Sequence, residues 1–251
     1  MIIEQRVPLR QRRDLSQIIE AAANLYVRNF WPLFRIAAVI IPLGIASAAL
    51  QSSIENDVAA AIVVGVLALV QAAVNLLAAA AVIAALSDMD AGKPAEFSRA
   101  YDVAFERFWT LAGALLRVFF HVVLFAITVV GIPWAIQRSI RWLFVEQAVI
   151  LDGTSAKAAL SYSADAVIGR WWRTFGIWIV ISVIAVVPAS IVTGLFTLAP
   201  VLVSGTVNAV VNAALLPFAV TAMTLLYFDL KIRKDAAGQS EAAGGHSGPA
   251  S

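Results

Sequence analysis

The chain has no cysteine and only two histidines among its 251 residues. The missing thiols exclude disulfides, thiolate metal sites and cysteine nucleophiles. One histidine, His246, lies in a tail rich in Gly, Ala and Ser, and the sequence has no phosphate-binding glycine loop, Gly-x-Ser-x-Gly elbow or His-rich metal motif. We therefore expect a protein that is not an enzyme and that needs no metal or cofactor.

Charged residues are also scarce, at 14% of the chain, whereas 61% of the residues are hydrophobic. The run from Phe175 to Phe228 has no Asp, Glu, Lys or Arg over 54 residues. Because one membrane crossing takes about 20 apolar residues, we expect this run to cross a membrane twice. The formal net charge of +2 gives no basic field of the kind that binds nucleic acid.

The apolar pattern predicts an all-α integral membrane helical bundle with six transmembrane helices, arranged as three hairpins with interfacial amphipathic helices. The expected spans are residues 30–50, 58–86, 109–130 and 133–151, with the last two on either side of a break at 194–205. A basic segment, residues 1–13, precedes this membrane domain of residues 14–234. The polar, small residues of 235–251 predict a disordered tail.

The three expected hairpins have a similar layout in residues 14–88, 94–152 and 154–229. In each, an amphipathic segment leads to an Arg and Trp pair, and the chain later returns to an aspartate: Trp31 to Asp88, Trp109 to Asp152, and Trp172 to Asp229. A threefold repeat explains this layout, and so does chance among alternating hydrophobic hairpins. Arg and Trp anchor helices at membrane interfaces, and the expected anchors are Arg28, Trp31, Arg107, Trp109, Arg170, Trp171 and Trp172.

The basic residues give the expected orientation. Six spans bring the N-terminal segment, the two longer polar segments and the C-terminus to one side, which then holds fourteen Lys and Arg residues. The turns assigned to the other side hold no Lys or Arg, and their only charged residues are Glu55 and Asp57. By the positive-inside rule, both termini are expected in the cytoplasm of a bacterial cell, with the protein in its cytoplasmic membrane.

Several segments resemble those of a known family: Leu9 to Phe34, Ala159-Leu-Ser-Tyr-Ser163 leading into Gly169-Arg-Trp-Trp-Arg173, and Leu225-Leu-Tyr-Phe-Asp-Leu-Lys-Ile-Arg-Lys234. They resemble the membrane domain found beside some bacterial glycerophosphoryl diester phosphodiesterases, which also occurs alone in other bacterial membrane proteins. Gly131-Ile-Pro133 and Asp152-Gly153 depart from the Pro-Gly and Glu-Gly of that family. In the family, the phosphodiesterase activity belongs to a separate soluble barrel with His and carboxylate residues, so the resemblance does not imply an enzyme here.

The middle hairpin holds a candidate intramembrane polar site. Arg117 and His121 are four residues apart and share one face of the third span, while Arg141 and Glu146 lie in the fourth. At about 1.5 Å per residue, Arg117 and Glu146 reach similar depths, as do His121 and Arg141. Charges at such depth usually pair or face water. The simpler interpretation is a structural Arg117–Glu146 pair, and the alternative is a site for a ligand, an ion or a lipid headgroup.

Neutral polar residues also occur in the expected spans. Gln71 with Asn75, and Asn208 with Asn212, share helix faces and are expected to hydrogen-bond across helices.

The leading functional hypothesis is a non-catalytic membrane protein that organises lipids or partner proteins. Its basic rim would attract anionic headgroups, at about 1 kcal/mol for each Lys or Arg near the surface. This hypothesis also allows an unidentified partner protein in the membrane. The competing hypothesis is a small transporter or channel for an anionic or lipid-like solute, which would use the four charged residues of the middle hairpin. A wet cavity at those residues favours transport, whereas a dry helix contact favours the first hypothesis.

Overall fold

The computed structural model describes residues 9–51 and 58–244, which form helices and contain no strand. The helices are α1 (Leu15–Arg28), α2 (Phe30–Ala37), α3 (Ile40–Gln51), α4 (Val58–Asp90), α5 (Phe97–Ala126), the 3-10 turn η1 (Val129–Gly131), α6 (Ile132–Arg141), α7 (Val145–Asp152), α8 (Ala156–Val167), α9 (Trp171–Leu195) and α10 (Val201–Gly244). Four of them, α4, α5, α9 and α10, are long and apolar enough to cross a membrane, and the bent pair of α2 and α3 would make five. The all-α class and the apolar spans are thus confirmed, but the arrangement of six spans in hairpins is not.

The first expected span is bent by 43° between α2 and α3. Pro42 has no amide hydrogen, and its ring clashes with the carbonyl group four residues earlier, at Ala38. The helix breaks at Ala38 and Val39, so the bend has a local cause in the sequence.

The fourth expected span is divided into α6 and α7, which are separated by a turn at residues 142–144. Trp142 and Phe144 are buried in the core. The buried hydroxyl of Ser163, on α8, accepts a hydrogen bond from the amide of Phe144 at 3.1 Å and donates one to the carbonyl of Arg141 at 2.8 Å. These bonds satisfy backbone groups that a continuous helix would pair internally. Residues 133–151 therefore do not form the single straight helix that we expected.

Helix α10 continues to Gly244, beyond the residue at which the sequence predicts a disordered tail. Elongating an existing helix adds a hydrogen bond per residue without a new nucleation step, and Ala, Gln and Glu are good helix formers. The prediction of disorder is therefore wrong for residues 235–244. Residues 245–251 lie outside the described part of the chain.

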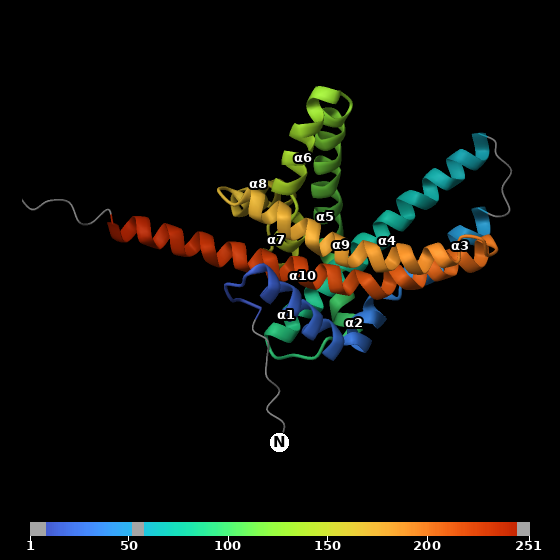
Figure 1. The fold of residues 1–251 in the computed structure, drawn as a ribbon, viewed down its shortest axis with the longest axis horizontal. Helices are drawn as coiled ribbons and strands as arrows, with labels where there is room; N and C mark the ends of the chain where they lie inside the picture. Colours follow the sequence, from blue (N-terminus) through green and yellow to red (C-terminus); the bar gives the residue numbers. More distant parts are fainter. Residues whose placement is uncertain (1–8, 52–57, 245–251) are drawn as a thin grey trace, which may run out of the picture.

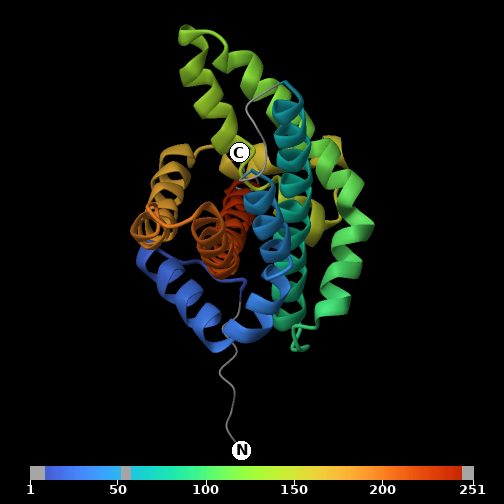
Figure 2. The ribbon, with the colours of Figure 1, turned by 90° about the vertical axis from the view of Figure 1, so that its right-hand side faces the viewer.

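The expected interfacial helices pack against the bundle. In α1, Asp14 is the N-cap, a position that aspartate favours, and the buried face includes Ile18 and Leu25. Tyr26 donates a hydrogen bond to the carbonyl of Ala214 on α10 at 2.6 Å, and α1 lies beside α10 in both views (Figures 1 and 2). The amphipathic pattern is confirmed, but protein covers the apolar face of α1 where we expected membrane lipid.

The core lies where the helices converge. Residues 78–86 of α4 and residues 224–230 of α10 are buried on every side. From there α4, the pair of α5 and α6, and the group of α3, α9 and α10 diverge in three directions (Figure 1). Large apolar side chains on these diverging parts are more than half exposed, among them Leu69 of α4, Leu124 of α5 and Ile191 of α9. We call the diverging parts the three arms.

Small residues set the close contact between α3 and α10. Gly44 and Ala48 are four residues apart on α3, and Gly205 and Ala209 have the same spacing on α10. A Cβ atom added to Gly44 would lie 2.6 Å from the Cβ atom of Ala209, and one added to Gly205 would overlap Ala48. Small residues at this spacing let the backbones of membrane helices approach.

We expect Gly44→Ala to lower the free energy of unfolding by about 1–3 kcal/mol, because the added methyl group overpacks the contact between α3 and α10. Thermal unfolding in detergent, followed by circular dichroism, measures this change. Gly65→Ala is the matched control, since no atom lies within 4 Å of a Cβ at Gly65. Equal effects of the two substitutions would refute the close contact.

Candidate functional site

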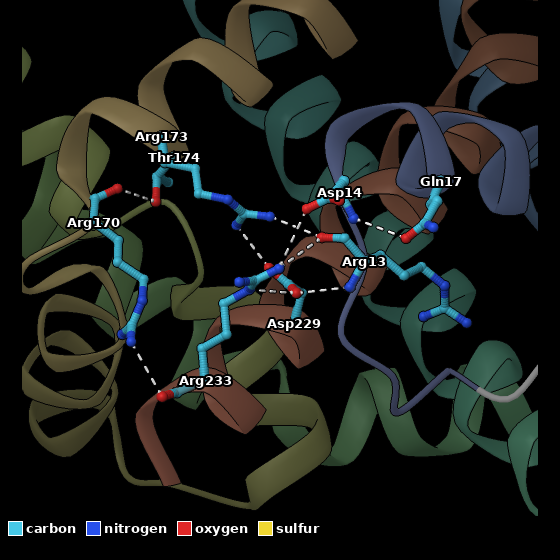
Figure 3. Close-up of polar contacts among 8 residues, drawn as sticks. All are labelled: Arg13, Asp14, Gln17, Arg170, Arg173, Thr174, Asp229 and Arg233. Carbon is cyan, nitrogen blue, oxygen red and sulfur yellow. Dashed lines mark hydrogen bonds and ion pairs between the residues drawn. The ribbon is translucent and has the colours of Figure 1, made fainter. Parts of the chain in front are cut away.

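The carboxylate of Asp229, on α10, is fully buried and forms the centre of a polar network (Figure 3). Its Oδ1 accepts hydrogen bonds from the amide of Arg13 at 2.9 Å and from Nε of Arg233 at 2.8 Å. Its Oδ2 accepts one from Nη1 of Arg173 at 2.6 Å. We call Arg13, Arg173, Asp229 and Arg233 the Asp229 clasp. A buried charge is tolerated when it is paired and hydrogen-bonded, and the clasp meets both conditions.

Both of the pairing guanidinium groups also bind the carbonyl oxygen of Arg13. Nη2 of Arg173 donates to it at 2.8 Å, and Nη2 of Arg233 donates to it at 3.3 Å. The planar guanidinium presents several N–H donors in a fixed geometry, which suits this double contact better than a lysine would. The clasp therefore joins the segment before α1, the first turn of α9 and the middle of α10.

The side chain of Arg13 is itself buried and donates from Nη1 to the carbonyl of Leu9 at 2.9 Å. Burial lowers the pKa of Arg13, and the carboxylates of Asp229 and Asp90 oppose this shift. Arginine remains protonated in proteins even when its pKa falls. Arg13 is thus a cation that positions its own backbone amide and carbonyl at the clasp.

The two other aspartates of the expected repeat are also paired. Asp88 at the end of α4 lies 2.9 Å from Nε of Arg99 on α5. Asp152 at the end of α7 accepts hydrogen bonds from the hydroxyl of Tyr227 and from Nζ of Lys231, both on α10. Each of the three aspartates therefore joins its own helix to another segment of the chain. The threefold repeat itself stays a prediction.

Arg117 and His121 lie on an exposed face of α5. Nη1 of Arg117 donates to the carbonyl of Gly113 at 2.8 Å, within the same helix. The ring of His121 packs against Trp142 with the ring centroids 5.4 Å apart, and the guanidinium of Arg138 lies 5.4 Å from the centroid of the same Trp142 ring. Trp142 thus connects α5 to the end of α6.

Glu146 lies in the first turn of α7, where the positive end of the helix dipole stabilises a carboxylate. Within residues 9–51 and 58–244, no ion pair joins Glu146 to Arg117 or to Arg141. The expected Arg117–Glu146 pair is therefore not formed. Similar depth does not bring two side chains together, because the rotation of each helix about its own axis decides which face they share.

The expected interface anchors divide into two groups. Trp31, Trp109 and Trp172 are 65%, 81% and 78% exposed, and Arg28 is exposed as well. Their exposure is compatible with an aromatic belt, and their role as interface anchors stays a prediction.

The remaining anchors bind other parts of the protein. Trp171 stacks on Phe175 and donates from Nε1 to the carbonyl of Gln137 at 3.4 Å. Arg107 donates to the carbonyl of Gly153 at 3.4 Å, and Arg170 donates to the carbonyl of Arg233 at 3.1 Å. These contacts hold α6, α7 and α10 against the neighbouring helices.

Among the described residues, no group of three His, Asp or Glu side chains gathers as metal ligands. The charged groups that do gather, in the Asp229 clasp and around Asp152, bind one another and backbone groups. Their arrangement supports a structural role.

Sequence reasoning did not predict the clasp as a unit. It singled out Asp229 as the closing aspartate of the third expected hairpin, and it singled out the segments that contain Arg13, Arg173 and Asp229 as parts of a family resemblance. The local signal was the spacing of Asp229 and Arg233, four residues apart on one helix. The contacts of Asp229 with Arg13 and Arg173 join residues far apart in the chain and had no signal in a single sequence.

Comparisons of this chain with protein families, with curated proteins and with solved structures found no match. The resemblance to the phosphodiesterase membrane domain therefore stays a prediction.

We expect Asp229→Ala to lower the free energy of unfolding by about 3–5 kcal/mol, because it leaves two arginines without their buried partner. Thermal unfolding in detergent measures this loss. The matched control is Asp165→Ala, which breaks a 3.9 Å pair with Lys234 whose side chains are both about half exposed. Such an exposed pair contributes about 0–1 kcal/mol. Similar losses from the two substitutions would show that the clasp does not stabilise the fold.

Proposed function

We propose that this chain is a non-catalytic, multi-pass protein of the bacterial cytoplasmic membrane that organises lipids or partner proteins. In this proposal, the bent pair of α2 and α3 and the pair of α6 and α7 each cross the membrane, in addition to the four long helices. Six crossings bring both termini to the same side of the membrane. The Lys and Arg residues on that side favour the cytoplasm by the positive-inside rule.

The observation that carries the proposal is the divergence of the three arms from one core (Figure 1). A helix that is apolar all round requires either protein or lipid against every face. The arms leave residues such as Leu69, Leu124 and Ile191 exposed, so acyl chains or partner helices must fill the spaces between them. A protein of this shape orders the molecules around it.

Unpaired basic residues add a preference for anionic lipids. Arg12, Arg28, Lys93 and Lys157 are exposed and have no ion-pair partner among the described residues. The exposed tryptophans provide the amphipathic rings that favour the headgroup region.

The transport hypothesis depended on a wet cavity at the charges of the middle hairpin. None of the four charged candidates lines the cavity of about 700 Å³ that lies among α3, α4, α9 and α10. The transport hypothesis therefore has no support from Arg117, His121, Arg141 or Glu146.

The test is to reconstitute the full chain in nanodiscs that contain phosphatidylglycerol and phosphatidylcholine, and to count retained lipids by native mass spectrometry. We expect the triple variant Arg12→Gln, Arg28→Gln and Lys93→Gln to retain at least about tenfold less phosphatidylglycerol, since each lost cation removes about 1 kcal/mol of attraction.

The control variant carries Arg12→Lys and Arg28→Lys and keeps every positive charge. It should retain phosphatidylglycerol like the wild type, and added salt should weaken retention in both. If the glutamine variant retains as much phosphatidylglycerol as the wild type, the anionic-lipid part of the proposal is wrong.

A further inference from the structure

A cavity of about 700 Å³ lies among α3, α4, α9 and α10. Its walls are rich in hydroxyl and amide side chains, including Ser47, Gln71, Asn75, Thr193, Asn208 and Asn212. None of the described residues that line it is charged. Asn212 precedes Asp229 by 17 residues on α10, so this part of the cavity lies about 25 Å from the clasp along that helix.

The small residues of the contact between α3 and α10 also line the cavity. Gly44, Ala48, Gly205 and Ala209 all belong to its walls. They bring the two backbones together on one side, while α4 and α9 form the other walls. The cavity thus follows from how four helices pack.

The polar side chains of the cavity do not hold the helices together. Asn212 donates from Nδ2 to the Oδ1 and the carbonyl of Asn208, on its own helix. Thr193 donates to the carbonyl of Ala189, also on its own helix. Within the described residues, no hydrogen bond joins a lining side chain to a different helix. The prediction that Asn208 and Asn212 bond across helices is therefore wrong.

Several side chains of the cavity wall consequently have hydrogen-bond donors and acceptors that no protein group uses. Oγ of Ser47 is buried and has no partner, and the amide groups of Gln71 and Asn75 have no hydrogen bond among the described residues. In a membrane, polar groups without partners carry a large free-energy cost. A ligand or water must satisfy these groups, and the volume lies within the range of small-molecule sites, about 300–1,000 Å³.

The lining determines the chemistry of that ligand. Amides and hydroxyls both donate and accept hydrogen bonds, and so they match groups that also do both. Without a charged residue, the described walls give no stabilisation to an anion or a cation. We propose that this cavity binds an uncharged, hydroxyl-rich group, which is either the sugar headgroup of a neutral glycolipid or a free sugar.

This inference is independent of the lipid-organising function, because it uses none of the exposed basic residues. The sugar-binding cavity and the lipid-organising function can therefore be tested separately, and either can fail without the other.

The experiment uses the full chain in phosphatidylcholine nanodiscs with two probes. In one arm, monoglucosyl diacylglycerol competes with diacylglycerol, and native mass spectrometry counts the retained lipid. In the other arm, free glucose is added and its binding is followed by saturation-transfer difference NMR. We expect the wild type to bind at least one glucose-bearing probe, with the glycolipid preferred about tenfold over diacylglycerol if the ligand is a lipid.

The double variant Asn75→Leu and Asn212→Leu should reduce that binding at least about tenfold, because it replaces two amides with groups that cannot hydrogen-bond. The control is Thr206→Val, on α10 but outside the lining, where the hydroxyl bonds only to the carbonyl of Leu202. Ser47→Ala is a milder second variant that removes one unpartnered hydroxyl, and it should reduce binding a few-fold without disturbing the packing.

Binding of glycolipid alone would identify a headgroup site, and binding of glucose alone would identify a site for a soluble sugar. The proposal is overturned if the wild type prefers neither glucose-bearing probe, or if the Asn75 and Asn212 variant and the Ser47 variant bind as strongly as the wild type. Circular dichroism and size-exclusion profiles establish that each variant is folded before it is scored.

Discussion

The burial of one carboxylate, that of Asp229, constrains most of this structure. An ionised group in an apolar interior needs opposite charge and hydrogen-bond donors close by. Here the donors come from the segment before α1, the start of α9 and α10 itself. Satisfying Asp229 therefore fixes where the N-terminal segment runs and how α9 meets α10. Helix α1 packs against α10, and its buried residues Ile18 and Leu25 belong to the same hydrophobic core as Leu225 and Leu226 of α10.

The two ends of the molecule differ in their polar chemistry. At the convergent end, charges are numerous and bind one another, in the Asp229 clasp and around Asp152. Near the cavity, where α9 ends and α10 begins, the polar groups are neutral amides and hydroxyls. Some of them have no hydrogen-bond partner in the protein and can bond to a ligand. The charged groups at the convergent end bind one another, so that end stabilises the fold. The neutral groups of the cavity keep free hydrogen-bond donors and acceptors, so the cavity is better suited to binding a ligand.

The middle hairpin shows why charged residues in an apolar segment are ambiguous. Arg117 bonds to its own helix and His121 packs against Trp142, while Glu146 lies in the first turn of α7. Arg117 and His121 are thus accommodated locally, by a backbone carbonyl and an aromatic ring. Besides the rotation of each helix, the break between α6 and α7 prevents depth from being read along one straight fourth span. Ser163 on α8 completes the break by bonding to both sides of the turn.

The sequence by itself determined the all-helical class and the apolar spans, because these follow from local composition and period. Local backbone chemistry also explains the Asp14 cap and the bend before Pro42. Only the tertiary structure decided that Asp229 meets Arg13 and Arg173, and that residues 78–86 of α4 are core while Leu69 on the same helix is exposed. A helix that is apolar on every face has no periodic pattern to show which face meets protein and which meets lipid. Only its neighbours in space make that distinction.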